Sequence, residues 1–170
     1  MYVTLVGGSM GFGAAEISSQ EELMSAERVY LLEQTKSKTD AQIMELVNIL
    51  GKPAVFLEIV MAILPLELDP DQSKDCVIGF EITAEERTHF FRVEIKDDVV
   101  TSEHRTGDVG KSDTTILVSL PNFVRLITEE LGGVKAFMQG KLWVKGNPTF
   151  AYSIPRMFPF LEKRQKEAVS

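Results

Sequence analysis

The chain has 170 residues, of which 44% are hydrophobic and 25% are charged, a composition typical of one folded globular domain. Its single cysteine, Cys76, excludes an internal disulfide framework and is compatible with a reducing compartment. The net charge of −7 argues against a nucleic-acid partner, although residues 111–170 alone carry 9 basic and 5 acidic side chains.

The first 40 residues are expected to form an extension ahead of the main domain. Four of the twelve glycines fall within residues 1–18, which predicts a short strand and a flexible loop. A cap at Ser18 followed by acidic residues favours a helix over 20–35. The apolar run at the start ends at Gly7, too short for a signal peptide, and we expect a cytoplasmic protein.

Two helices are predicted next. Thr39 and Asp40 can cap the first, whose apolar positions follow a helical period at Ile43, Leu46, Val47 and Leu50. Gly51 ends it, and Pro53 begins a second helix over 54–64. This second helix is apolar on nearly all sides, so it must be covered by protein or by something bound.

The apolar period then changes from helical to alternating. The segments 77–82, 89–96 and 99–104 predict an antiparallel meander, and 114–119 and 141–145 predict two further strands. These strands and the helices around them indicate an α+β domain with one five-stranded, mainly antiparallel sheet.

Helices are also predicted between and after the last two strands. One begins at Leu120 and is closed by Gly132 and Gly133, and a short one follows over 134–139. Asn147 and Pro148 start a last helix, which is interrupted by Pro155 and Pro159.

The glycine-rich segment Gly7–Gly13 matches two catalytic motifs at once. Gly7, Ser9 and Gly11 fit the G-x-S-x-G elbow of serine hydrolases, and the same segment resembles a dinucleotide-binding loop. Neither motif has its usual setting, because no parallel βαβ pattern follows it. We therefore expect no catalytic residue and no cofactor, and a serine hydrolase using Ser9 is the weaker alternative.

Other residues that could carry chemistry have simple structural interpretations. The paired acids Asp69/Asp71, Glu85/Glu86 and Asp97/Asp98 fall in predicted turns. His89, His104 and Cys76 fall short of a four-ligand zinc site unless carboxylates join them, so no metal site is expected.

The second half of the chain resembles the sterol carrier protein 2 family. The run from Asp113 to Ile127 looks like a strand of that family that leads into a helix. The segment from Ala136 to Asn147, AFMQGKLWVKGN, carries the most specific part of the likeness. The resemblance covers about residues 43–158, and the same domain also occurs as a carboxy-terminal module of alkyl sulfatases.

The resemblance implies a sheet covered by helices, with a hydrophobic tunnel between them for fatty acids, fatty acyl-CoA or sterols. It implies binding and transfer of lipid, with a lipid-binding domain over 41–161. The charged residues from Glu162 onward are expected to form a tail over 162–170. From periodicity and position, we expect the tunnel to be lined by Phe56, Val60, Phe91, Phe123, Ile127, Phe137, Met138, Phe150 and Ile154.

Two further predictions concern what the protein contacts. The basic side chains of the last third could meet a lipid headgroup, a CoA phosphate or a membrane surface, or simply be solvated; they include Lys135, Lys141, Lys145 and Arg156. The main alternative to a carrier is a non-catalytic accessory or oligomerisation module whose tunnel is filled with side chains. The sequence does not fix the oligomeric state.

Overall fold

The structure, a computed structural model, describes residues 34–158. The Gly7–Gly13 segment with Ser9, nearly all of the helix expected over 20–35, and the tail 162–170 lie outside the described residues.

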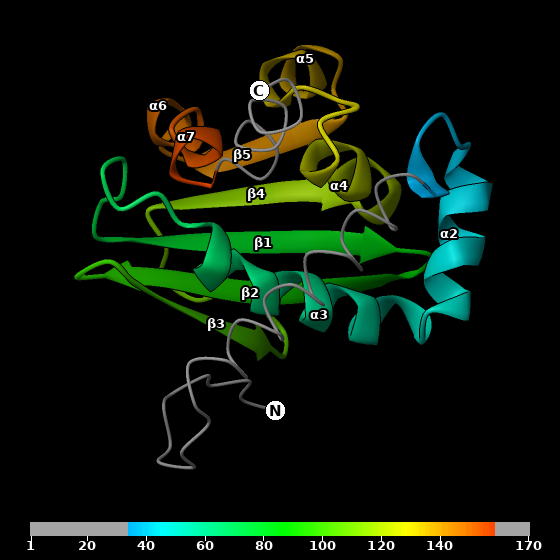
Figure 1. Ribbon diagram of the computed structural model, residues 1–170, viewed down its shortest axis with the longest axis horizontal. Coiled ribbons are helices and arrows are strands. Elements are labelled where there is room, and N and C mark those ends of the chain that lie inside the picture. Colours follow the sequence, from blue (N-terminus) through cyan, green and yellow to red (C-terminus); the bar gives the residue numbers. More distant parts are fainter. Residues whose placement is uncertain (1–33, 159–170) are drawn as a thin grey trace, which may run out of the picture.

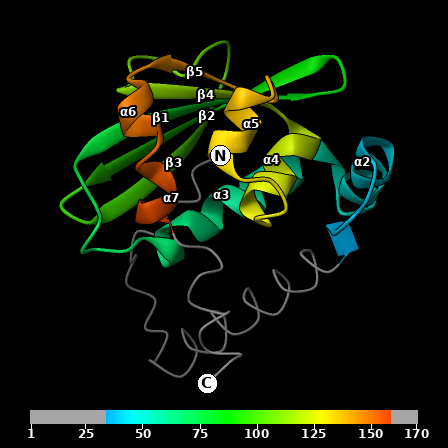
Figure 2. The ribbon, with the colours of Figure 1, turned by 90° about the horizontal axis from the view of Figure 1, so that it is seen from above.

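The described residues form a sheet with helices on one of its faces (Figures 1 and 2). The strand order is β3-β2-β1-β4-β5, and only β1 and β4 run parallel to each other. This confirms the predicted α+β fold with a five-stranded, mainly antiparallel sheet. The strands are β1 (Cys76–Ala84), β2 (Arg87–Lys96), β3 (Val99–Arg105), β4 (Thr114–Ser119) and β5 (Leu142–Gly146). The helices are α2 (Asp40–Ile49), α3 (Lys52–Glu67), α4 (Leu120–Ile127), α5 (Gly133–Met138), α6 (Pro148–Ala151) and α7 (Ile154–Met157).

The alternating pattern of the strands sets which side chains face the helices. In β1 and β2 the inward positions are buried, and they include Ile78, Ile82, Phe91 and Val93. The β1–β2 register places Phe80 opposite Phe91, and the parallel β1–β4 register places Ile116 beside Phe80. The apolar side chains of neighbouring strands therefore form one continuous inner face.

Helix α3 covers the half of the sheet that contains β1, β2 and β3. Its buried side chains include Phe56, Leu57, Val60 and Met61. The helix was expected to be covered on most sides, yet Val55, Ile59 and Leu66 are exposed. It also continues past Pro65 to Glu67, further than the predicted end at 64, because a proline in the last turn removes only one helical hydrogen bond.

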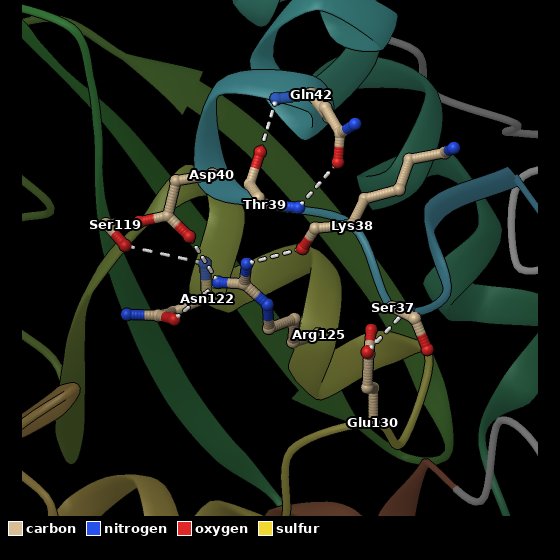
Figure 3. Close-up of polar contacts among 9 residues, drawn as sticks. All are labelled: Ser37, Lys38, Thr39, Asp40, Gln42, Ser119, Asn122, Arg125 and Glu130. Atoms are coloured by element: carbon tan, nitrogen blue, oxygen red, sulfur yellow. Dashed lines mark hydrogen bonds and ion pairs between the residues drawn. The ribbon is translucent and has the colours of Figure 1, made fainter.

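A polar cluster joins the start of α2 to α4 (Figure 3). Thr39 and Gln42 form a capping box at the start of α2. The Arg125 guanidinium of α4 donates to the Lys38 carbonyl at 3.0 Å and pairs with Asp40 at 2.6 Å. It also donates to Asn122 at 3.1 Å, so a single side chain fixes α2 against α4.

The outer face of the sheet is partly covered by the loop that joins β3 to β4. Val109 of this loop is buried against Gly79, where an added Cβ would lie 2.7 Å from the Val109 side chain. Arg92 donates to the Lys111 carbonyl and holds the loop in place. All helices of the described residues lie on the opposite face (Figure 2).

Replacing Arg125 tests the junction between α2 and α4. We expect Arg125→Ala to lower the free energy of unfolding by about 1–2 kcal/mol, because the Lys38 carbonyl loses a charge-assisted hydrogen bond and Asp40 loses its partner. Urea denaturation followed by circular dichroism measures this change. Arg87→Ala, at an exposed position, is the matched control and should change it by less than about 0.5 kcal/mol. Equal stabilities for the two variants would contradict the assignment.

Cys76 at the start of β1 is buried and reduced. Burial, together with the nearby carboxylates of Asp113 and Asp75, raises the pKa of its thiol from 9.0 to about 11. The thiolate, which is the reactive form, is therefore about a hundredfold scarcer in the folded protein than in the unfolded chain at neutral pH.

The raised pKa of Cys76 predicts slow alkylation of the folded protein and a loss of stability at high pH. Iodoacetamide at pH 8 should modify native Cys76 at least about a hundredfold more slowly than the urea-unfolded chain, as followed by intact mass. Above pH 9 the unfolded state loses its thiol proton before the folded state does, so the stability contributed by this group falls as pH rises toward 11. Equal alkylation rates in the two states would contradict a buried thiol.

Candidate functional site

A large cavity lies between the sheet and the short helices that follow β4. Its volume is about 1120 Å³. One wall is the inner face of the sheet, with Phe80 of β1, Ile116 of β4, and Leu142 and Val144 of β5. This space is above the upper end of the 300–1,000 Å³ range usual for ligand pockets.

The opposite walls come from helices that are too short to fill the space. Helix α4 ends at Ile127, where Glu129 takes a left-handed conformation, rather than continuing to Leu131 as predicted. Gly132 then caps α5 instead of closing the preceding helix. Asn147 accepts a hydrogen bond from the Phe150 amide at 3.1 Å and caps α6 as expected.

Helices α6 and α7 contribute a further part of the wall, and they correspond to the interrupted last helix of the prediction. Met61 and Leu64 of α3 also line the cavity. Pro155 lies in the first turn of α7, where the missing amide hydrogen costs no helical bond. The Asp69 amide, in the loop after α3, donates to the Met157 carbonyl at 2.8 Å. This bond ties α7 to the loop that leads into β1, and the two lie side by side in Figure 2.

The mouth of the cavity is marked by apolar side chains that line it and yet are exposed to solvent. In α5, Met138 is 81% exposed, Val134 55% and Phe137 38%. Tyr152, directly after α6, lies against Phe137, with ring centroids 6.4 Å apart. Exposed apolar side chains in such a group are typical of a surface that meets another apolar phase.

Few polar side chains contribute to the wall of the cavity. The charged and amide residues in it are Glu129, Lys135, Gln139 and Arg156. Within residues 34–158, neither Lys135 nor Arg156 takes part in an ion pair. Two cations near an apolar space suit an amphiphile with an anionic head.

The structure separates the nine residues expected to line a tunnel into three groups. Five of them line this cavity: Phe123, Ile127, Phe137, Met138 and Ile154. Phe56, Val60 and Phe91 do not line it, because they are buried within the hydrophobic core. Phe150 points to a second, smaller hollow beside α6. Whether the five residues contact a ligand stays a prediction.

Several residues of the wall escaped the sequence analysis. Ile116 was recognised as part of a strand but not as a cavity residue, because its position depends on the parallel pairing of β1 with β4. Leu142 and Val144 were placed on one face of the last strand, and that alternation was the available signal. Tyr152 has no periodic pattern that could reveal it.

A second group of polar side chains lies between α3 and β3, away from the cavity. His104 Nδ1 lies 3.0 Å from the Glu58 carboxylate, and the His104 ring stacks on Phe91 with centroids 4.4 Å apart. Burial, followed by the neighbouring His104 and Arg87, lowers the pKa of His89. These contacts hold α3 against the edge strand β3.

The part of the chain that the structure describes has neither a metal-binding cluster nor a single membrane-spanning helix. Residues 34–158 contain no group of three or more His, Cys, Asp or Glu side chains that could hold a metal ion. No single helix there has the length and hydropathy to cross a membrane, and α2 and α3 reach that threshold only together across an 84° bend.

The comparison with known sequences identifies a family. Residues 71–158 match the model of the SCP-2 sterol transfer family. Over 60 residues the chain is 38% identical to the oleate-induced peroxisomal protein POX18 of Candida maltosa. That alignment covers 35% of this chain and 47% of the relative, so the chain spans about half the length of the curated relative it matches.

A solved structure shares the fold of the described residues. The sec-alkylsulfatase Pisa1 from Pseudomonas sp. superposes with a TM-score of 0.53 at 16% identity, over 60% of this chain and 16% of that chain. Sterol carrier protein 2 from Yarrowia lipolytica, in its apo form, gives a TM-score of 0.46 at 25% identity, over 58% and 86% of the two chains.

The family match covers just over half of the chain and includes the whole sheet and helices α4 to α7. Lipid binding or transfer is the general role that this family indicates. The chain belongs to the SCP-2 sterol transfer family.

Proposed function

We propose that this protein binds one hydrophobic ligand, a fatty acid, a fatty acyl-CoA or a sterol, in the cavity between β4–β5 and the short helices, and transfers it between membranes or enzymes. The observation that carries the proposal is the cavity itself, about 1120 Å³ with a mainly apolar wall. Inward side chains such as Ile116 and Leu142 offer no hydrogen bonds, so they favour an apolar guest over water.

The physical basis of binding is removal of the ligand's hydrocarbon from water. Each buried methylene contributes about 0.8 kcal/mol, so a long acyl chain binds more tightly than a short one. The cavity is mainly apolar, which suits a range of acyl chains and also a sterol ring system. Selectivity in such a site comes from the polar end of the ligand.

The alternative of an accessory module with a filled tunnel is supported less well. A filled tunnel requires the inner face of β4 and β5 to be packed by side chains from the helices. Helices α5, α6 and α7 have six, four and four residues, and they leave the space beside Val144 open.

We also propose that binding proceeds without covalent chemistry. The thiol of Cys76 is buried and its pKa is raised, which makes it a poor nucleophile. His104 is engaged by Glu58 beneath α3. The compartment also stays a proposal: the cytoplasm is expected from the sequence, while the relative from Candida maltosa is named as peroxisomal.

Blocking the cavity tests the proposal. Wild-type protein, delipidated and titrated with the fluorescent fatty acid cis-parinaric acid, should bind one molecule saturably, and palmitate should displace it. Val144→Trp combined with Ala151→Phe adds bulk to two walls of the cavity and should weaken binding by at least about tenfold.

The matched control for this experiment lies on the other edge strand. Val99 of β3 is 60% exposed and does not line the cavity, so Val99→Trp should leave the affinity for cis-parinaric acid unchanged. No saturable binding by the wild-type protein would overturn the carrier function and favour the accessory module. Equal losses in the two variants would place the ligand elsewhere.

We further propose that the mouth of the cavity contacts anionic membranes. Residues 131–158 contain four basic side chains and no acidic one, in a chain whose net charge is −7. Met138 and Val134 project from α5 in the same segment and are exposed. Cations attract the surface of an anionic bilayer, and exposed apolar side chains can enter its interface.

Vesicle binding tests this contact. Co-sedimentation should be stronger with vesicles of phosphatidylcholine containing phosphatidylglycerol than with phosphatidylcholine alone, and it should weaken as salt increases. Met138→Asp should reduce binding severalfold, whereas Ile49→Asp, at the exposed end of α2, should not. Equal binding to neutral and anionic vesicles would contradict the proposal.

A further inference from the structure

A second hollow lies beside α6 and adjoins the apolar cavity. Its volume is about 460 Å³. Tyr152 and Arg156 line both spaces, so the two spaces share part of a wall. The residues that line the hollow are Lys74, Asn147, Thr149, Phe150, Tyr152, Ser153 and Arg156.

This hollow brings together parts of the chain that are far apart in sequence. Lys74 belongs to the loop between α3 and β1, and the rest of the wall comes from α6, α7 and their flanks. The same loop is tied to α7 by the bond from Asp69 to Met157, and it passes beside α7 in Figure 2. The loop that carries Lys74 is therefore joined to α7 by a backbone hydrogen bond.

The charge in the hollow has one sign. Its wall holds two cations, Lys74 and Arg156, and no carboxylate, although the chain has 25 acidic residues. The carboxylate of Asp75, which follows Lys74, accepts a hydrogen bond from the backbone amide of Asp97 at 2.9 Å. Among residues 34–158 no carboxylate forms an ion pair with Lys74 or Arg156. Both side chains are therefore available to bind an anion.

Uncharged donors accompany the two cations. The side-chain oxygen of Asn147 accepts a hydrogen bond from the Phe150 amide at 3.1 Å, which leaves the side-chain NH₂ as a donor. Thr149 contributes a hydroxyl group to the same wall. A phosphate has several acceptor oxygens and up to two negative charges, and it is matched by this set of donors better than a carboxylate is.

We propose that this hollow is a subsite for a phosphate-bearing headgroup of an acylated ligand whose hydrocarbon chain occupies the apolar cavity. The inference rests on the proposed function and deepens it, because it makes phosphate in the head the feature that the protein selects. A simple fatty acid has its carboxylate directly on the chain and reaches only the shared wall at Arg156. A phosphorylated head extends past Tyr152 toward Lys74.

The test compares ligands that share one acyl chain and differ in the head. The probes are palmitate, palmitoyl-CoA and 1-palmitoyl lysophosphatidic acid, each displacing cis-parinaric acid from the full-length protein. Lys74→Glu replaces a positive charge outside the apolar cavity with a negative one. It should lower the affinity for the two phosphate-bearing probes by about tenfold. Palmitate affinity should change by less than about twofold.

The matched control is Lys52→Glu, the same charge change at an exposed position that lines neither space. It should leave all three affinities unchanged. If Lys74→Glu weakens the binding of palmitoyl-CoA alone, the subsite binds the phosphates of an acyl-CoA. If it weakens the binding of lysophosphatidic acid alone, the subsite binds a phospholipid headgroup. Equal effects of Lys74→Glu and Lys52→Glu on every probe would overturn the subsite.

Amide chemical shifts give a second readout that needs no variant. Titration with lysophosphatidic acid should shift the backbone amides of Lys74 and Thr149, whereas palmitate should leave both in place. If palmitate binds but neither phosphate-bearing probe shifts the Lys74 amide, the subsite is overturned and the proposed function stands. Failure of all three probes to bind would overturn the proposed function itself.

Discussion

The structure depends on one apolar face of the sheet that long and short helices cover to different extents. The inner side chains of all five strands form a continuous apolar surface, which must be removed from water. Helix α3, with 16 residues, packs directly on the half formed by β1–β3. The half formed by β4 and β5 receives only α4 and three shorter helices, and side chains such as Ile116 and Val144 face an open space of about 1120 Å³. A full-length second helix in that place would have closed it.

Local sequence signals fix the ends of the elements that create this space. Asn147 caps α6, Gly132 caps α5, and Pro155 limits α7 to a new, separate turn. Each of these residues lies at the start of a short helix. Arg125 then fixes the start of α2 against α4, so one wall of the cavity is held from outside by polar contacts rather than by packing into the cavity. The open volume is thus maintained by chain geometry.

Much of the fold could be predicted from the sequence because its signals are local. The short run after a polar, glycine-containing loop predicted the strand over 114–119 with the bounds observed, and the caps at Thr39 and Asn147 act as expected. The candidate site was harder, since Phe56 and Phe123 carry similar patterns and yet only Phe123 lines the cavity. The difference arises from the parallel pairing of β1 with β4, a long-range contact that no short pattern contains. The proximity of Lys74 to Arg156 escaped prediction for the same reason.

The most direct test of the account is to locate a bound acyl chain. Isotope-filtered nuclear Overhauser spectra of the delipidated protein loaded with ¹³C-labelled palmitate report which methyl groups lie within about 5 Å of the chain. The account predicts cross-peaks from the acyl methylenes to Ile116, Ile127 and Leu142, whose side chains face the cavity. Cross-peaks restricted to the opposite face of the sheet, at Leu117 and Trp143, would contradict it.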